Sequence, residues 1–468
     1  MANNNQSHLK DNPQLTKRPA FWQAMLIMSA LVLIFTISII GYHLPPYIPL
    51  IAGISLVMAV GRLLGHSFSQ LQANLLAGLQ TGLAPLFLFL LIGMLIALWL
   101  ATGVIPTMLV LGFKLANEQW FLPSALLVMA LVGSMIGSAF TTIATIGTVL
   151  MGIGTTLGIA PDILAGAIIS GAIFGDKSSP LSDSTNLAAS IAQTDLFAHI
   201  KNMMWTTIPA LAVSLVLFTW LGLGHQGIAH PAELRQLMAL FKPSWWAVLP
   251  LGLLVLMAWR RIPAIPTLLV NVVVSAAAFL TQKGLPALNE LLLNGYQSYS
   301  SQPVVAALLD RGGMLAMMPT VITIMLALAL GGLLTEQGIL QAVMLPLAKR
   351  LHSQAGVVTG AIISGIVANF MIGEQYLATI IPGQLWKADF DRLKLSRLAL
   401  SRTLEDSGTV FNYLVPWGVA GSFAAQTLGV SVWHFMPFVF FAWLSPLFSL
   451  LAAWTGIGLK QATPSRRS

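Results

Sequence analysis

The chain has 468 residues, of which 56% are hydrophobic and only 8% are charged, and its formal net charge is +8. An ordinary soluble protein is about 25% charged, so this composition argues against a water-soluble fold. The basic residues occur in short groups between hydrophobic stretches, which favours a role in membrane orientation over nucleic-acid binding. No cysteine is present, which excludes disulfides, thiolate metal sites and a cysteine nucleophile.

Hydrophobic stretches of about 17 to 25 residues, each long enough to cross a bilayer, recur from Phe21 almost to the C-terminus. The first, Phe21 to Ile40, is too long for a signal-peptide core and lacks a small-residue cleavage site, so we expect it to be retained. In chain order, the expected spans or half-spans lie near residues 21–40, 45–61, 84–101, 121–138, 142–158, 161–190 and 202–222, and then near 245–258, 264–280, 314–334, 355–372, 374–386, 404–422 and 432–456.

One long polar connection, Gly224 to Pro243, divides these segments into two sets of seven. The expected organisation is a polar cytoplasmic N-terminus (1–20), a first transmembrane repeat (21–223), a linker (224–244), a second transmembrane repeat (245–457) and a basic cytoplasmic tail (458–468). An odd number of crossings would insert the two halves with opposite orientations, and the distribution of basic residues agrees with this. We therefore expect an all-α integral membrane protein with two inverted-topology repeats, discontinuous helices and re-entrant hairpins. It would have about 10 to 14 membrane segments, with its N- and C-termini cytoplasmic.

Weak internal similarity supports two repeats. The stretch Leu100 to Val104 resembles Thr335 to Ile339 at an offset of 338 − 103 = 235. The same offset places Gly137 to Thr142 opposite Ile372 to Leu377, and both interrupt apolar sequence with polar residues. Inverted repeats of this kind are typical of secondary transporters.

The segment from Gly175 to Asn186 places two carboxylates and many hydroxyls within apolar sequence. A charge at the bilayer centre costs about 2.5 to 3.5 kcal/mol, so these residues should face a protein interior or an aqueous cavity. Pro180 predicts a broken helix, whose freed carbonyls either bind a cation or accept from neighbouring side chains. A loop at the membrane surface is the alternative, because Gly, Asp, Ser and Pro are common there. The density of acids and hydroxyls favours a site.

A second segment, Thr403 to Gly418, again combines acids, hydroxyls and a helix-breaking residue, Pro416. Asp406 follows Asp176 by 406 − 176 = 230 residues, which is close to the repeat offset. If each half contributes one discontinuous helix to a shared site, these two acids should approach each other near the bilayer midplane. The alternative is that Glu405 and Asp406 only cap a cytoplasmic helix end, and Glu405 is the more easily explained in this way.

The polar interruptions at Gly137 to Thr142 and Asn369 to Tyr376 are predicted to form the tips of re-entrant hairpins. They make Thr141, Thr142 and Glu374 further candidates. Tight helix packing explains the Gly and Thr residues equally well.

Enzymatic chemistry finds little support. The eight histidines are scattered without metal-ligand spacing, and no phosphate-binding Gly-rich loop is present. We therefore expect neither an enzyme nor an ATP-driven pump, and no cofactor other than the transported ions.

The segment 175–186, together with Gly373 to Leu377 and Leu400 to Thr409, resembles the NhaC family of sodium/proton antiporters, which belongs to the ion-transporter superfamily. The similarity extends over roughly residues 20 to 455. It implies a multi-pass carrier of the bacterial inner membrane that exchanges Na+ for H+. A homodimer is compatible with this resemblance. Because some family members resemble malate/lactate antiporters, the alternative is a Na+- or H+-coupled transporter of a small carboxylate.

The resemblance implies a set of cation- and proton-binding residues: Asp176, Ser179, Ser182, Asp183, Thr185, Asn186, Glu374, Glu405, Asp406, Ser407 and Thr409. The second-tier candidates are Thr141, Thr142, Lys177 and Asn412. Na+ is a hard cation that prefers oxygen ligands, and we expect it at Asp176, Asp183 and Asp406. By comparison with the family, Val419 and Ala420 are less polar than expected, which leaves the substrate side of the second broken helix open.

Coupling would follow from competition of a proton and a sodium ion for one carboxylate. Asp183 is the preferred exchanger, because Ser179 and Asn186 would lie within its reach on a resumed helix. On this hypothesis Asp183→Asn abolishes exchange, whereas Lys177→Ala mainly shifts its pH dependence.

Overall fold

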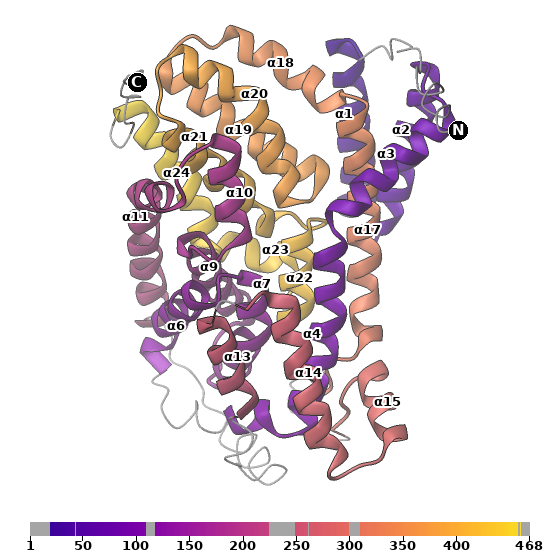
Figure 1. Ribbon diagram of the computed structural model, residues 1–468, viewed down its shortest axis with the longest axis vertical. Coiled ribbons are helices and arrows are strands. Elements are labelled where there is room, and N and C mark those ends of the chain that lie inside the picture. Colours follow the sequence, from indigo (N-terminus) through magenta and orange to yellow (C-terminus); the bar gives the residue numbers. More distant parts are fainter. Residues whose placement is uncertain are drawn as a thin grey trace, which may run out of the picture.

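The computed structural model describes residues 19–42, 44–108, 118–223, 249–260, 262–298, 309–456 and 459. Over these ranges all regular structure is helical (Figure 1). Six of the described helices are apolar and long enough to cross a membrane, and one bent pair is a further candidate. The chain is therefore a multi-pass membrane protein. The expected linker (224–244), nearly all of the N-terminal segment (1–20) and nearly all of the tail (458–468) lie outside the described residues.

The helices of the first half follow in chain order. They are α1 (Phe21–Phe35), the π-helix η1 (Thr36–Gly41), α2 (Tyr47–Leu63), α3 (Phe68–Thr81), α4 (Leu83–Ala101), the 3-10 helix η2 (Glu118–Trp120), α6 (Phe121–Ile136), α7 (Ala139–Thr142), the π-helix η3 (Ile143–Gly147), α8 (Thr148–Thr156), α9 (Pro161–Ser178), α10 (Asp183–Ala192) and α11 (Leu196–Leu223).

The second half continues in the same way. Its helices are α13 (Leu249–Trp259), α14 (Ala264–Leu280), α15 (Leu285–Asn294), α17 (Met314–Glu336), α18 (Ile339–Arg350), α19 (Gln354–Ile372), α20 (Gln375–Arg392), α21 (Arg397–Leu404), the π-helix η5 (Glu405–Thr409), the 3-10 helix η6 (Val410–Leu414), α22 (Val419–Leu428), α23 (Val432–Phe435), the 3-10 helix η7 (Met436–Phe438) and α24 (Phe440–Thr455).

Most helices lie where hydrophobic runs predicted them, but α3, α15 and α18 were not predicted, and α21 meets a predicted segment only at Leu404. Each of these three mixes apolar with amide or charged side chains. A search for continuous apolar runs misses such amphipathic helices, because only one face of the helix is hydrophobic.

The predicted breaks in the helices are confirmed. Helix α9 ends at Ser178 and α10 begins at Asp183, so that Pro180 lies in the gap. Likewise, η6 ends at Leu414 and α22 begins at Val419, on either side of Pro416. Proline has no N–H and its ring crowds the preceding turn, which disfavours helix at both gaps, although Pro209 and Pro319 lie inside continuous helices.

Two sharp turns connect α6 to α7 and α19 to α20. Gly137 and Gly373 adopt left-handed backbone conformations with φ of +71° and +72°, which a side chain would strain. The next residue caps the following helix in each case: Ser138 Oγ accepts from Thr141 N at 3.3 Å, and Glu374 Oε2 accepts from Leu377 N at 2.9 Å.

Helix α9 packs closely on α6, which fixes the position of its C-terminal end. The two backbones approach at Gly133 and Gly175, where a Cβ on Gly175 would lie 2.5 Å from Gly133 Cα. Elsewhere α17 packs against α2 and α3 to form a separate apolar cluster. Figure 1 shows α10, α20 and α21 toward the top of the molecule and α13, α14 and α15 at the bottom.

We expect Gly175→Ala to destabilise the protein by about 1 to 3 kcal/mol, because the added methyl group overpacks the α6–α9 contact. Thermal unfolding of the detergent-solubilised protein measures this loss. Gly252→Ala on α13 is the matched control, because nothing lies within 4 Å of its added Cβ. Equal stability of the two variants would show that the α6–α9 contact relaxes freely.

Candidate functional site

The end of α9 meets η5, α11 and α24 in a buried polar cluster. Lys177 forms an ion pair with Asp406, and both side chains are buried. Ser445 on α24 accepts from Lys177 Nζ and donates to Asp406 Oδ1, each at 2.7 Å. Thr206 on α11 also donates to Asp406 Oδ1, at 3.3 Å. Lys177 therefore matches the charge of Asp406, whereas Asp406 Oδ2 is buried with no hydrogen-bond partner among the described residues.

Two other carboxylates share one hydroxyl. Ser184 Oγ, in the first turn of α10, lies 3.1 Å from Glu405 Oε1 and 3.4 Å from Asp176 Oδ2. A serine hydroxyl has one proton to donate, so it cannot serve both carboxylates at once. Thr409 Oγ1 lies 3.0 Å from Glu405 Oε1, but Glu405 Oε2 is buried with no hydrogen-bond partner among the described residues. Glu405 therefore keeps one carboxylate oxygen without a donor among the described residues.

A cavity of about 500 Å³ reaches Asp176, one of the two carboxylates. Its wall includes Asp176, Asp183, Ser184, Ser138 and Tyr376. Asp183 is exposed and Asp176 is partly exposed, whereas Glu405 is fully buried behind Ser184. Among the described residues that line this cavity the charged ones are both acidic. The arrangement therefore admits cations to Asp176.

Most of the other polar residues of the first break complete its backbone hydrogen bonding. Thr185 Oγ1 donates to the Lys177 carbonyl at 3.2 Å. Asn186 Nδ2 donates to the carbonyls of Pro180 and Ser182 at 3.1 and 2.7 Å. Ser179 Oγ accepts from Leu181 N at 3.2 Å. These side chains supply partners that the interrupted helix lost.

Ser182 connects the break to the acids. Its hydroxyl caps α10 by accepting from Thr185 N at 3.4 Å, and it lies 2.9 Å from Ser184 Oγ. Through Ser184 it is linked to the Asp176 carboxylate. Ser182 and Ser184 thus place two hydroxyls beside Asp176.

The remaining predicted residues lie next to the cluster or at the two turns. Ser407 donates to the Thr403 carbonyl at 2.8 Å. Asn412 donates to Asn369 Oδ1 at 2.8 Å. Thr142 donates to the Ser138 carbonyl at 2.8 Å, and Thr141 Oγ1 lies 3.2 Å from Ser138 Oγ. Glu374 caps α20 and is not among the acids that share Ser184.

Comparison with known proteins identifies the family of the chain. The chain matches the Na+/H+ antiporter family over residues 15–185 and 171–457, which together include most of its length. The chain belongs to this family. The resemblance noted in the sequence is confirmed.

Several relatives are similar over nearly their whole length. The Na+/H+ antiporter NhaC of Alkalihalophilus pseudofirmus is 36% identical over 95% of this chain and 98% of its own length. NhaC of Bacillus subtilis is 37% identical over 87% and 92%. The malate-2H+/Na+-lactate antiporter of Bacillus subtilis is 30% identical over 94% and 95%. A solved structure of MtrF from Neisseria gonorrhoeae, in a class of antimetabolite efflux pumps, aligns with a TM-score of 0.40 at 13% identity over 93% of this chain and 95% of that one.

In this family member, some cluster residues were not among the predicted site residues. Ser184 lies inside the predicted motif, eight positions after Asp176, and a helical restart after Pro180 could have indicated it. Thr206 and Ser445 carry no such signal, because single hydroxyl residues are common in membrane helices. Arg402 is buried one turn before Asp406.

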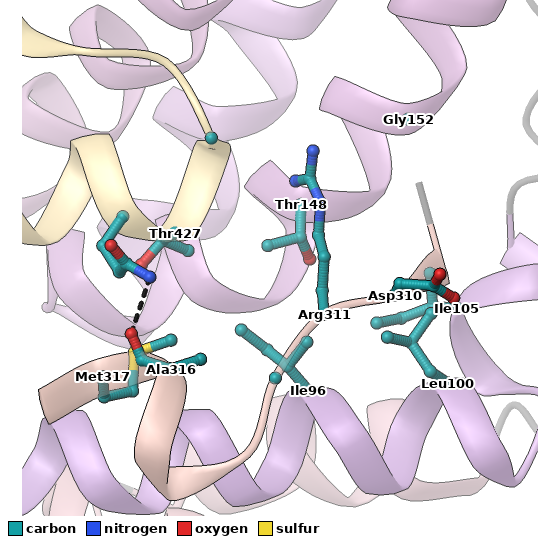
Figure 2. A pocket seen from close by; sticks show the side chains of 13 residues that line it. Ile96, Leu100, Ile105, Thr148, Gly152, Asp310, Arg311, Ala316, Met317 and Thr427 are labelled. Atoms are coloured by element: carbon teal, nitrogen blue, oxygen red, sulfur yellow. Dashed lines mark hydrogen bonds between the residues drawn. The ribbon is translucent and has the colours of Figure 1, made fainter. Parts of the chain in front are cut away.

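A second, smaller cavity of about 180 Å³ in the antiporter is separate from the acids (Figure 2). Figure 2 shows the Arg311 side chain reaching into it beside Thr148. Arg311 Nη1 donates to the Leu428 carbonyl at 3.4 Å, so its charge lies at the C-terminal end of α22. Gln426 Nε2 donates to the Ala316 carbonyl at 2.7 Å. A cation at a helix C-terminus is stabilising, so this arrangement holds α22 in place.

Proposed function

We propose that the protein exchanges Na+ for H+ at the carboxylate pair Asp176 and Glu405. The observation that carries this proposal is the sharing of one donor, Ser184, by two acids while the third acid, Asp406, pairs with Lys177. The proposal differs from the sequence-based hypothesis, in which Asp183 was the preferred exchanger and Asp406 a sodium ligand.

The buried charges support a single exchangeable cation. Two fully buried acids, Glu405 and Asp406, and the partly exposed Asp176 lie near two buried basic side chains, Lys177 and Arg402. One negative charge is left without a partner. An uncompensated buried charge costs several kcal/mol, so the cluster favours one bound monovalent cation. A proton or a sodium ion meets this need equally, and the two exclude each other.

The donor set also suits Na+. Carboxylate and hydroxyl oxygens lie together here, with Ser184 Oγ between Asp176 and Glu405, and Glu405 Oε2 is without a partner in the described structure. Hard cations prefer such oxygen ligands. Because protons compete for the same carboxylates, sodium binding should strengthen as the pH rises.

The charge of the cavity favours a cation over a small carboxylate as cargo. Asp176 and Asp183 are the charged residues among its described lining residues, and both would repel an organic anion. The similarity to a malate-2H+/Na+-lactate antiporter keeps the alternative of a coupled carboxylate carrier.

The helix ends support two repeats at a single offset. The segment α7 to α8 (139–156) corresponds to α20 (375–392), α9 (161–178) to α21 through η6 (397–414), and α10 (183–192) to α22 (419–428), each displaced by 236 residues. Both sharp turns, at Gly137 and Gly373, obey the same offset. We propose that these repeats are inverted, with both termini cytoplasmic, in the bacterial inner membrane.

Transport by purified protein in liposomes tests the function. An outward-directed sodium gradient should drive proton movement, followed with a pH-sensitive dye, without malate or lactate present. A potassium gradient of equal size is the control for ion specificity. Proton movement that required an added carboxylate would reject Na+/H+ exchange in favour of the carboxylate carrier.

A further inference from the structure

The repeat offset identifies the position in the second half that corresponds to Asp176. Adding 236 gives Asn412, and the same operation on Ser184 gives Ala420. The residue that the sequence offset paired with Asp176 was Asp406, at 230. The offset of 236 shared by the helix ends gives a different pairing, in which Asp406 corresponds to Ser170 (406 − 236 = 170).

The contacts of the two positions correspond as well. In the first half, Ser184 at the start of α10 donates toward Asp176 Oδ2. In the second half, Ala420 at the start of α22 donates its backbone N–H to Asn412 Oδ1 at 2.8 Å. Each side chain at the end of one half-helix therefore accepts from the first turn of the next, across a proline-containing break.

The two positions differ in charge and in their remaining partners. Asp176 opens into the cavity, whereas Asn412 is fully buried. Asn412 Nδ2 donates to Asn369 Oδ1, and Asn369 Nδ2 donates to the carbonyls of Ser407 and Gly408 at 2.9 and 2.6 Å. The second break is thus closed by neutral hydrogen bonds that also hold η5, which carries Glu405.

We propose that Asn412 is the uncharged counterpart of Asp176 and that the residue at this position determines how many cations the protein binds. This inference rests on the proposed function. With an amide here, the second half contributes no exchangeable charge of its own at this position. A carboxylate here would create a second cation site.

The local geometry gives the reason. Asn369 cannot turn its amide around without losing the bonds that its Nδ2 makes to Ser407 and Gly408. In Asn412→Asp, a carboxylate oxygen would therefore face Asn369 Oδ1, where a donor now lies at 2.8 Å. Two acceptors in contact in a buried site are stable only with a proton or a cation between them.

Sodium binding to the purified full-length protein tests the proposal, with radioactive sodium measured at saturation over a range of pH. We expect Asn412→Asp to bind a second equivalent of sodium, with a steeper dependence on pH. Asn271→Asp on α14 is the matched control, because Asn271 is an equally buried amide away from the breaks. It should add no sodium.

The exchange variant Asp176→Asn/Asn412→Asp covers the case in which Asn412→Asp fails to fold, because it leaves the number of carboxylates unchanged. We expect it to bind one equivalent of sodium, whereas Asp176→Asn alone binds none. A folded exchange variant without sodium binding, or a folded Asn412→Asp that binds no more sodium than the unmodified protein, would overturn the inference. Absence of sodium binding by the unmodified protein would instead reject the proposed function.

Discussion

Replacement of Glu405 by glutamine is expected to abolish sodium-driven proton movement. Glutamine keeps the size of the fully buried Glu405 side chain but removes one of the three negative charges of the cluster. Asp176 and Asp406 are then balanced by Lys177 and Arg402, and no further cation is required. Sodium-driven proton movement in liposomes containing Glu405→Gln should equal that in liposomes without protein. Asp176→Asn should give the same result.

Asp183→Asn is the control for this experiment, because Asp183 lies in the same cavity but is exposed. An exposed charge contributes only about 1 kcal/mol at close range, which corresponds to about a fivefold change in apparent sodium affinity. Exchange should therefore persist at high sodium concentration. If Asp183→Asn were inactive and Glu405→Gln active, the original sequence-based assignment of Asp183 as exchanger would be correct.

The spans and breaks of this fold could be predicted because they depend on local sequence. Continuous apolar runs predict the membrane helices, and Pro180 and Pro416 each belong to a segment with acids and hydroxyls, where the loss of a backbone donor favours a break. The three amphipathic helices were missed for the opposite reason, since their polar faces lower the average hydrophobicity of each window. The two turns were located by their polar residues, and Gly137 and Gly373 proved to be the left-handed positions.

The pairing of charges could not be predicted in the same way. Lys177 is adjacent to Asp176 in sequence, so local reasoning linked these two residues, but an α-helix directs neighbouring side chains about 100° apart. Lys177 instead meets Asp406, 229 residues away. The sequence also paired Asp176 with Asp406 at an offset of 230 residues, which is six fewer than the offset of 236 between the helix ends (236 − 230 = 6). That pairing matched one acid with another and ignored where the helices end. Only the three-dimensional arrangement shows that Asp176 faces Glu405 across Ser184.

Replacement of Lys177 by methionine is expected to destabilise the protein by about 3 to 5 kcal/mol. The change leaves Asp406 buried without its cation, and removal of one partner from a buried ion pair costs about this much. The sequence-based expectation was different: it predicted mainly a shift in the pH dependence of exchange, because it treated Lys177 as a neighbour of Asp176. Thermal unfolding in detergent measures the loss.

The double variant Lys177→Met/Asp406→Asn separates the ion pair from the exchange site. It removes one positive and one negative charge together, so the cluster keeps a single unmatched carboxylate charge. A protein in which neutral groups replace a buried ion pair is often no less stable than the original. We expect it to recover most of the stability lost in Lys177→Met and to retain sodium-driven proton movement. A double variant that is stable but inactive would show that Asp406 itself carries the exchanged cation. The shared Ser184 would then be a structural contact between α10 and η5, and the charge that the cluster leaves unmatched would have to be assigned to Asp406.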